Sequence, residues 1–442
     1  MAPSHETTTV SPASGGEAGS AVDAEVGSIG RGRHVLILIE NLTLPIDRRV
    51  MLEARSLLKA GFRVSCITPR MYDYRQLREN VEGVEMYRYP FIEAKSGAVA
   101  YAFEFGWCLL CTWLLSMWVV LTRGRFQLIH ACNPPDTFWL VGLFWRPFGT
   151  RFLFDEHDVC PAVYEAKFRT DAGEQPNARL TGILRWLERQ SLRHAAAVVN
   201  VCESYRDESI RKGADPAKCF VVRSAPDLSR FRLVERVEEL REGHAAVGVY
   251  LGVMGPQDGL DLLVGAIGEF VNGLGRRDCL FILIGDGPSR EPSMRLAEEL
   301  GIMAHVRFPG YVSGERLLQL LSIADFGMIP DPKTPFNDMT AMNKAYEYPA
   351  LRLPFVAFDL HENRRTAGED AGRYVPAHDL RRFAEEMAGL CDDCELRRRM
   401  GEAGRRHIEA HHTWGHAEKH LFQAYQYALS DEGAVPGTAV WG

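Results

Sequence analysis

The chain has 442 residues, of which 46% are hydrophobic and 25% charged, and its formal net charge is −7. This length allows two domains with full hydrophobic cores, and the composition is ordinary for a water-soluble globular protein. The net negative charge argues against a general nucleic-acid-binding protein. The ten cysteines are scattered along the chain, which is typical of a reduced, intracellular protein.

The N-terminal residues 1–32 are rich in Ser, Thr, Ala, Gly and acidic side chains. We expect them to form a disordered tail, and they contain no apolar segment of the kind found in a signal peptide. Two C-x-x-C pairs occur further on, one in an apolar run (Cys108 and Cys111) and one in an acidic run (Cys391 and Cys394). Neither pair has the turn residues of a zinc site, so we expect no metal there.

The first regular elements alternate between strand and helix. Residues 34–40 (HVLILIE) form a continuous apolar run, typical of a strand buried on both faces. A helical repeat follows and ends at Gly61, and residues 63–69 (RVSCITP) form the next strand. This order favours a parallel sheet, in which ligands bind at the carboxyl ends of strands. The first strand–helix loop therefore offers Asp47 and Arg48 to a ligand, although Asp47 is also a candidate helix N-cap.

A long apolar segment occupies residues 105–122 (FGWCLLCTWLLSMWVVLT), with no charged side chain between Glu104 and Arg123. Its length is borderline for a membrane-spanning helix. Three interpretations remain open: a buried crossover helix, an interfacial helix that contacts a membrane, and a membrane-spanning helix. Lys95 and Arg125 also flank the segment, and such basic residues suit a lipid surface.

A titratable cluster follows in the same half of the chain. NPPD at 133–136 is a turn at the end of one strand, and the next strand, residues 151–161, contains Asp155, His157 and Asp158. The carboxyl end of a strand is where an α/β protein places its active site. His157 is the group there that exchanges protons near neutral pH. The alternative is a helix N-cap at Asp158 beside a merely polar histidine.

An acidic, arginine-rich connector over residues 232–244 separates this half from a second half with the same alternation. The second half carries a glycine-bearing loop with Gly255 and Gly259, and a strand that ends at Gly285. The sequence therefore predicts α/β domains over 33–231 and 245–410. A helix over 411–429 is expected to pack back on the domain junction, followed by a short tail at 430–442.

The segment TPFNDMTAMNKAYEYPALRLP precedes a buried strand and carries Asn343, Lys344 and Glu347. On a helix, Asn343 and Glu347 share one face and Lys344 lies beside it. A helix start with a cation and a carboxylate is suited to a nucleotide diphosphate, because backbone N–H groups and the lysine bind phosphate oxygens. The alternative is a surface helix with a Lys–Glu pair.

In their order, these segments resemble the family-4 glycosyltransferases of the GT-B type, especially the bacterial branch that builds exopolysaccharide or lipopolysaccharide on lipid carriers. The likeness covers about residues 33–429. Its motifs are PIDRRVMLEARSLLKAGFRV at 45–64, FDEHDVCPAVYEAKF at 154–168, VVRSAPDLSRF at 221–231, GVMGPQDGLDLL at 252–263, IGDGP at 284–288 and NKAYEYPALRLPFVAF at 343–358. The resemblance implies two Rossmann-like domains facing across a cleft, and retaining transfer of a sugar from a nucleotide-sugar donor to a lipid-linked or glycan acceptor.

The resemblance also implies roles for single residues. Glu347 matches the glutamate that binds the donor ribose, Lys344 faces the diphosphate, and His157 matches a histidine near the junction of sugar and acceptor. The further candidates for donor binding are Asp47, Arg48, Gly255, Gly259, Gly285, Asn337, Asp338 and Asn343. No D-x-D-like metal motif ends a strand, so we expect neither a metal nor a cofactor.

The sequence departs from the family pattern at three positions. Met339 stands where a glutamate is common, so sugar contacts are expected from Asn337 or Asp338. Val253 and Asp258 stand where arginine and lysine often neutralise the diphosphate. That charge is then expected from Lys344, Arg48 or Arg49 and helix N-termini.

Two other functions remain open at this point. The missing cations at Val253 and Asp258 are compatible with a non-catalytic subunit that binds nucleotide sugars. The same fold also serves phosphorylases and sugar-phosphate synthases, whose soluble substrates need no membrane contact. For the glycosyltransferase, we expect a cytoplasmic location, with residues 105–122 touching the inner face of the plasma membrane.

Overall fold

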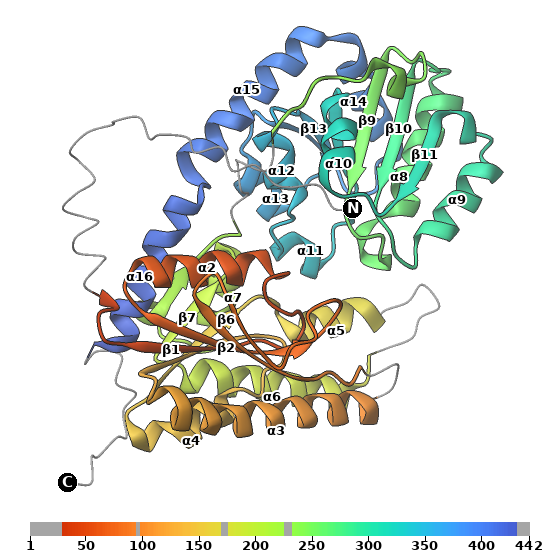
Figure 1. Ribbon diagram of the computed structural model, residues 1–442. Coiled ribbons are helices and arrows are strands. Elements are labelled where there is room, and N and C mark those ends of the chain that lie inside the picture. The colour runs from red at the N-terminus through yellow and green to blue at the C-terminus, as the bar shows by residue number, and fades with distance from the viewer. Residues whose placement is uncertain (1–28, 94–97, 169–175, 225–231, 431–442) are drawn as a thin grey trace, which may run out of the picture.

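The computed structural model describes residues 29–93, 98–168, 176–224 and 232–430, so nearly all of the predicted tails, 1–32 and 430–442, lie outside the described residues. Its first domain is built on an eight-stranded sheet in the order β3-β4-β2-β1-β5-β6-β7-β8 (Figure 1). The strands are β1 (His34–Leu38), β2 (Arg63–Arg70), β3 (Arg78–Val81), β4 (Val84–Pro90), β5 (Leu128–Cys132), β6 (Arg151–Glu156), β7 (Ala197–Asn200) and β8 (Cys219–Val221). Neighbouring strands are parallel, as predicted, apart from the β3–β4 hairpin.

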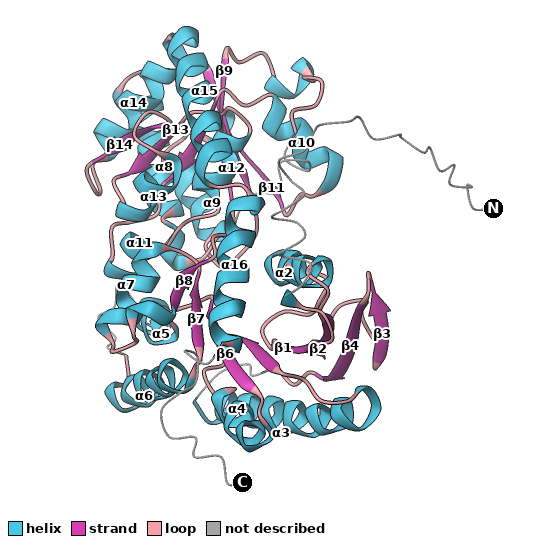
Figure 2. Ribbon diagram, turned by 90° about the vertical axis from the view of Figure 1, so that its left-hand side faces the viewer, coloured by secondary structure: helices cyan, strands magenta, loops and turns pink. Residues whose placement is uncertain are grey.

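Helices cover both faces of this sheet, and β1, β5 and β7 are accordingly buried along their whole length. The helices are α2 (Arg48–Lys59), α3 (Ala98–Arg123), α4 (Trp139–Trp145), α5 (Cys160–Phe168), α6 (Ala178–His194) and α7 (Glu203–Arg211). α2 packs on one face, and α3, α4 and α6 lie side by side along the other (Figures 1 and 2).

The second domain has a six-stranded parallel sheet in the order β11-β10-β9-β12-β13-β14. The strands are β9 (Ala246–Leu251), β10 (Cys279–Ile284), β11 (Val306–Gly310), β12 (Phe326–Ile329), β13 (Phe355–Phe358) and β14 (Gly372–Val375). The helices are α8 (Leu260–Gly268), α9 (Arg290–Glu299), α10 (Gly314–Ser322), α11 (Pro335–Met339), α12 (Lys344–Ala350), α13 (His361–Ala367), α14 (Leu380–Asp392) and α15 (Cys394–His411). Short 3-10 turns lie at Arg146–Phe148, Pro216–Lys218, Glu238–Arg241, Pro256–Asp258 and Met303–His305, and a π-helical turn at Glu269–Gly273.

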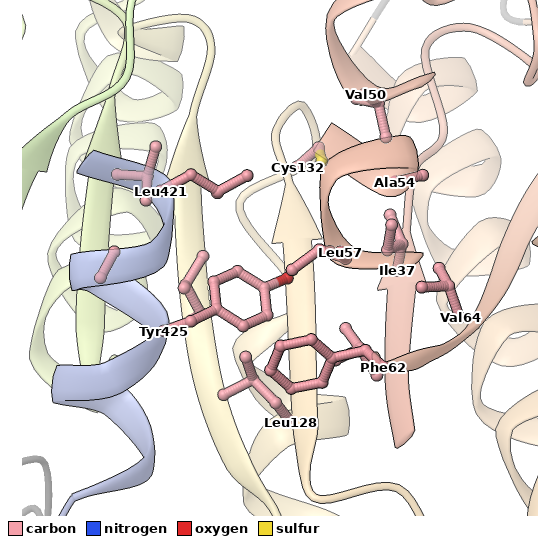
Figure 3. Packing of buried hydrophobic residues seen from close by; sticks show 14 of the residues in the cluster. Ile37, Val50, Ala54, Leu57, Phe62, Val64, Leu128, Cys132, Leu421 and Tyr425 are labelled. Carbon is pink, nitrogen blue, oxygen red and sulfur yellow. The ribbon is translucent and has the colours of Figure 1, made fainter. Parts of the chain in front are cut away.

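The last helix, α16 (Trp414–Leu429), returns to the first domain and lies against β7 and β8. Leu421 and Tyr425 enter the same core as Ile37 and Leu128 (Figure 3). The ring of Tyr425 meets the ring of Phe62 edge-on, with 5.5 Å between the centroids. The first domain is therefore completed by residues from the opposite end of the chain.

Helix α3 contains the long apolar segment, and its polarity is the reverse of that of an ordinary surface helix. The stripe that packs into the domain consists of Glu104, Cys108, Thr112, Ser116 and Val119, whereas the exposed stripe consists of Phe103, Leu110, Leu114, Trp118 and Leu121. Within the described residues, Ala100–Arg123 is long and apolar enough to cross a membrane, and 22% of its most apolar stretch is buried. The helix is therefore not the fully buried crossover that was one of the three interpretations.

Candidate active site

A buried ionic network lies where β5 and β6 end in the first domain. The carboxylate of Asp155 accepts hydrogen bonds from Arg49 at 3.0 Å and from Nε2 of His157 at 2.8 Å. Nε2 of His130 lies 3.1 Å from the same carboxylate, and Nδ1 of His130 lies 2.7 Å from the hydroxyl of Tyr425 on α16. The last helix is thereby connected to His157 through two intervening side chains.

The charges of this network shift the pKa values of its members. Burial would raise the pKa of Asp155, but Arg49 and His157 hold it well below the usual range. Burial lowers the pKa of His157, but Asp155 more than compensates, so the pKa of this histidine is raised. Asp155 therefore stays ionised and stabilises the protonated form of His157, whose side chain is 11% exposed.

Three side chains of the network are of types that bind metals. His130, Cys132 and Asp155 each place one candidate ligand atom within 4.8 Å of the others. However, the guanidinium of Arg49 lies against the same carboxylate and repels a further cation. Burial, together with Asp155, also raises the pKa of the Cys132 thiol well above its usual value. The chemistry of this cluster thus favours a hydrogen-bond network, and the absence of a metal requirement stays a prediction.

Asn133 holds the loop that carries His157. Its Oδ1 accepts hydrogen bonds from the backbone N–H groups of His157 at 2.7 Å and Asp158 at 3.1 Å, and its Nδ2 donates to Asp136 at 2.8 Å. The next helix begins at Cys160, two residues after the predicted cap Asp158. The sequence predicted only a turn at NPPD. It gave no sign that Asn133 would bind the backbone of the loop that carries His157.

Three loops of the second domain meet at the carboxyl ends of β9, β10 and β12. A Cβ atom at Gly285, whose φ is +146°, would lie 1.8 Å from the carbonyl oxygen of Gly252. A Cβ atom at Gly259, whose φ is +67°, would lie 2.3 Å from a carbonyl oxygen of the loop after β12. Glycine alone fits these close approaches. The N–H of Gly255 donates to Asp258 at 2.8 Å, which closes the β9 loop on itself.

Lys344 is buried among these loops, with 6% of the residue exposed. Its ammonium lies 3.2 Å from Asp331 and 5.0 Å from the centre of the Tyr250 ring. Burial lowers the pKa of Lys344, but Asp331 and Asp258 raise it by more, so the ammonium stays charged. Because two carboxylates surround one ammonium, this point of the second domain carries little net positive charge.

Glu347 lies one turn after Lys344 on α12, and Asn343 is the exposed residue that precedes this helix. Burial raises the pKa of Glu347, while the charges of Arg48 and Lys344 partly offset that rise. Arg48 is the exposed first residue of α2, so its effect on Glu347 acts between the two domains. Among the described residues, the carboxylate of Glu347 accepts no hydrogen bond, which leaves its oxygens available to a ligand.

Three other predicted site residues form hydrogen bonds with backbone groups of the protein. Asp47 accepts from the backbone N–H of Val50 at 3.1 Å and is the N-cap of α2, the alternative that the sequence had left open. Nδ2 of the buried Asn337 donates to two backbone carbonyl groups, at 2.9 and 3.0 Å. Asp338 accepts from the backbone N–H of His361 at 2.8 Å. Oδ1 of Asn337 is buried and has no hydrogen-bond partner among the described residues.

Met339 stands where a glutamate was expected, and it joins the two domains. Met339 and Ala341 pack against Val159, Cys202 and Tyr205 of the first domain. The thiol of Cys202 also lies 3.4 Å from the carbonyl oxygen of Met339. Met339 is half-buried and also lines a cavity between the domains, so its apolar side chain favours the contact with the first domain without filling that cavity's polar wall.

Comparison with known proteins gives matches over both domains. A family model described as a glycosyl transferase 4-like domain matches residues 46–225, and one described as glycosyl transferases group 1 matches residues 245–393. An alpha-D-kanosaminyltransferase of Streptomyces kanamyceticus is 28% identical over 50% of this chain and 57% of its own length. A D-inositol 3-phosphate glycosyltransferase of Jonesia denitrificans is 27% identical over 69% of this chain and 72% of its own length.

Solved structures with the same arrangement are more distant in sequence. Sucrose-phosphate synthase from Thermosynechococcus elongatus has a TM-score of 0.69 at 18% identity, covering 90% of this chain and 100% of the other. Anabaena HepE in complex with UDP-glucose has a TM-score of 0.64 at 13% identity, covering 89% and 99%. At this identity the likeness shows the fold, and it confirms the predicted pair of Rossmann-like domains.

Proposed function

Because the chain belongs to the family-4 glycosyltransferases of the GT-B type, we propose that it transfers a sugar from a nucleotide-sugar donor to a lipid-linked glycan, with retention of the anomeric configuration. In this proposal the second domain binds the donor and the first domain binds the acceptor. The product is an extended glycan in the synthesis of a polysaccharide.

The observation that carries the proposal is Glu347, a carboxylate without a hydrogen-bond partner among the described residues, near Arg48 of the other domain. A ribose diphosphate complements this pair, since ribose hydroxyl groups donate to a carboxylate and phosphate oxygens accept from a guanidinium. At Gly259 and Gly285 the backbone approaches neighbouring carbonyl groups too closely for a side chain, so these loops of the second domain stay free of side chains at both positions. HepE, which shares the fold, was solved in complex with UDP-glucose, which supports a nucleotide-sugar donor.

In the proposed reaction, the bond between the anomeric carbon and the diphosphate breaks, a bond to the acceptor hydroxyl oxygen forms on the same face of the sugar, and the proton of that hydroxyl passes to the departing diphosphate. Negative charge develops on the leaving diphosphate, where fixed cations and backbone N–H groups stabilise it. The positive charge of Lys344 is largely offset by the carboxylate of Asp331, and Val253 and Asp258 supply no cation. Arg48 is therefore the main cation of the site in this proposal, and His157, held by Asp155, orients the acceptor hydroxyl.

The acceptor part of the proposal is supported by the outer face of the first domain. The exposed apolar stripe of α3 is continued by Leu140 and Phe144 of α4 and by Ile183 and Trp186 of α6. These three helices lie side by side in Figures 1 and 2. An apolar surface shared by neighbouring helices is typical of an interaction site.

The charges on this face favour a lipid bilayer as its occupant. Helix α6 carries the exposed basic residues Arg179 and Arg193 on the same face as Ile183 and Trp186, whereas its Arg185 and Arg189 line a cavity shared with the second domain. Exposed aromatic and aliphatic side chains with arginines beside them bind the surface of a bilayer that contains anionic lipids. These features support our proposal that the enzyme acts in the cytoplasm, at the inner face of the plasma membrane, where lipid-linked acceptors are presented.

This face also weighs against the soluble alternative. Sucrose-phosphate synthase shares the fold, but a synthase or phosphorylase with water-soluble substrates has no use for an exposed apolar stripe on α3. The non-catalytic alternative is disfavoured because His157, Lys344 and Glu347 are all retained and lie near the strand ends.

Turnover with a defined acceptor tests the proposal. Purified protein is incubated with a panel of nucleotide sugars and with vesicles that carry lipid-linked glycans, and the product linkage is assigned by NMR. We expect transfer from one donor with the anomeric configuration preserved. An inverted linkage would refute retention, and preferred transfer to a free sugar phosphate would refute the acceptor class. Thermal stabilisation by a nucleotide sugar without turnover would indicate the binding subunit instead.

A further inference from the structure

Arg223 lies at the end of the first domain and contacts the second domain. It follows β8 by two residues and belongs to the sequence motif VVRSAPDLSRF at 221–231, to which the proposed reaction assigns no role. Only 6% of the residue is exposed. A buried guanidinium needs partners for its charge and for its N–H groups. The partners of Arg223 therefore indicate what this residue does.

These partners come from both domains. In the first domain, Arg223 forms an ion pair with Glu203, the first residue of α7. In the second domain, it donates to the hydroxyl of Tyr346 on α12 at 2.8 Å and to the hydroxyl of Thr366 on α13 at 3.1 Å. The carboxylate of Glu362, one turn before Thr366, lies 3.4 Å from the guanidinium. One arginine of the first domain thus contacts two helices of the second.

A second set of hydrogen bonds joins the domains at the same place. Both the backbone N–H and the hydroxyl of Ser204, at the start of α7, donate to the carboxylate of Glu362, at 3.1 and 2.7 Å. Glu362 is fully buried and therefore shared between Ser204 and Arg223. A small displacement of the domains would leave several buried polar groups without partners, which is costly. The network accordingly favours one relative position of α7 and α13.

Tyr346 connects this network to the helix that carries the donor-binding carboxylate. It directly precedes Glu347 on α12, and 2% of the residue is exposed. Its ring meets the ring of His412 edge-on, with 5.7 Å between the centroids. Helix α12 has seven residues and contains Pro349. Because so short a helix with a proline is weakly held by its own hydrogen bonds, its orientation depends on side-chain contacts such as that with Arg223.

Successive residues of α12 face two arginines of the first domain. Tyr346 binds Arg223, and the charge of Arg48 partly offsets the rise that burial causes in the pKa of Glu347. Neighbouring residues point about 100° apart around a helix. A rotation of α12 that breaks the contact between Tyr346 and Arg223 therefore also changes the direction of Glu347 relative to Arg48.

We propose that Arg223 is a positioning residue for the transfer reaction, which fastens α12 to the first domain in the orientation in which Glu347 and Arg48 bind the donor together. This role rests on the proposed function, because it takes Glu347 as the donor carboxylate. Arg223 acts through Tyr346 and not on the substrate. Without it, a smaller fraction of molecules holds α12 ready for the donor, and the apparent affinity falls by that fraction. Saturating donor restores the arrangement.

Two variants test this role through donor kinetics. Tyr346→Phe removes one hydroxyl and keeps the ring that packs on His412, and Arg223→Gln removes the guanidinium. In both, KM for the nucleotide sugar should rise about tenfold, the size expected for a hydrogen bond to a charged group, while kcat stays within about twofold. Calorimetric titration with UDP and with GDP should show the same loss of affinity. The double variant should be no weaker than Arg223→Gln, because both changes remove one contact.

Tyr374→Phe is the matched control, because its hydroxyl donates to the backbone of Gly368 at 2.7 Å within the second domain. It should keep the wild-type KM. Small-angle X-ray scattering without donor should give a larger radius of gyration for Arg223→Gln but not for Tyr374→Phe.

A lowered melting temperature with wild-type KM in Tyr346→Phe would show a merely structural role and overturn the proposal, as would unchanged scattering in Arg223→Gln. A wild type that transfers no sugar would instead refute the proposed function, and the scattering comparison, which needs no donor, would still decide whether Arg223 holds the domains together.

Discussion

The two domains share one architecture but differ in what they expose. Among the described residues, 17 large hydrophobic side chains are exposed, and 14 of them precede residue 187. Only Leu233, Val253 and Tyr311 lie after it. The interiors of both domains are ordinary α/β cores, so the difference lies in their outer helices. The same fold thus presents an apolar outer surface in the first domain and a more polar one in the second.

The strand ends of the two domains differ as well. In the first domain the network around Asp155 is buried and its charges are paired with one another. In the second domain Glu347 has no hydrogen-bond partner among the described residues. A paired network maintains the position of its side chains, whereas an unpaired carboxylate is available to a ligand. Substitutions at the two sites should therefore have different consequences.

The largest effect is expected for Asp155→Asn, which leaves Arg49 and His157 buried without their common carboxylate. Removing one partner of a buried ion pair costs about 3–5 kcal/mol. The free energy of unfolding, measured by urea denaturation, should fall by this amount, and transfer should slow. Asp73→Asn, at an exposed carboxylate, is the control and should leave both unchanged. A fully stable Asp155→Asn protein would mean that the network is not a structural element of the first domain.

Glu347→Gln should affect activity and leave stability nearly unchanged. The amide keeps the shape of the side chain but is a weaker acceptor for the donor hydroxyl groups. We expect kcat/KM for the nucleotide sugar to fall about a hundredfold, equivalent to about 2.7 kcal/mol. The exposed Glu299→Gln provides the comparison in the same domain. Wild-type kcat/KM in Glu347→Gln would remove this residue from the donor site.

The contrast between the outer faces is tested with Trp118→Glu/Leu121→Glu. Each side chain contributes about 1.5–3 kcal/mol when it is buried in an apolar phase. Co-sedimentation with vesicles containing anionic lipids should therefore weaken by at least about tenfold, without loss of donor binding. Tyr311→Glu, at a side chain of the second domain that is 78% exposed, is the control and should not alter sedimentation. Equal sedimentation of both variants would contradict a bilayer on the α3 face.

The smallest effect concerns the dependence of stability on pH. Glu40 follows β1, and burial together with Glu104 of α3 raises its pKa from 4.5 to about 8. Between these values the folded protein holds a proton that the unfolded chain has released, so stability falls as the pH rises through this range. Glu40→Gln should make the fall between pH 5 and 8 shallower by about 1 kcal/mol or more. An unchanged slope in thermal unfolding curves would contradict the buried carboxyl pair.

The parallel strands could be predicted because each is a short apolar run between turn residues. The predicted strand 34–40 contains β1 (His34–Leu38), and the predicted segment 105–122 lies within α3. The β3–β4 hairpin was missed because β3, with the sequence RENV, is polar and lies at the edge of the sheet. α14 and α15 were also missed, although their heptad-like apolar spacing was available in the sequence.

The sequence predicted His157, Lys344 and Glu347 as site residues from single motifs, and these roles stay predictions. Contacts between distant segments were not predictable. His130 and Tyr425 are 295 positions apart, and no local pattern pairs them. The electrostatic effect of Arg48 on the pKa of Glu347 was not predictable either, because the two residues come from different domains. The use of Asn337 and Asp338 in backbone contacts depends on loop geometry, which residue types alone do not specify.

The position of α16 has a consequence for the biosynthesis of the protein. Its side chains complete the core around Ile37 and Leu128 (Figure 3), and the hydroxyl of Tyr425 lies 2.7 Å from Nδ1 of His130. A ribosome makes the strands of the first domain early but delivers α16 only after residue 413, when the second domain has already been made. Until then the surface under α16 is exposed, while all of β9 to β14 has already been synthesised. The second domain therefore has everything it needs to fold before the first domain is complete, and premature termination before residue 414 would leave the first domain without part of its core.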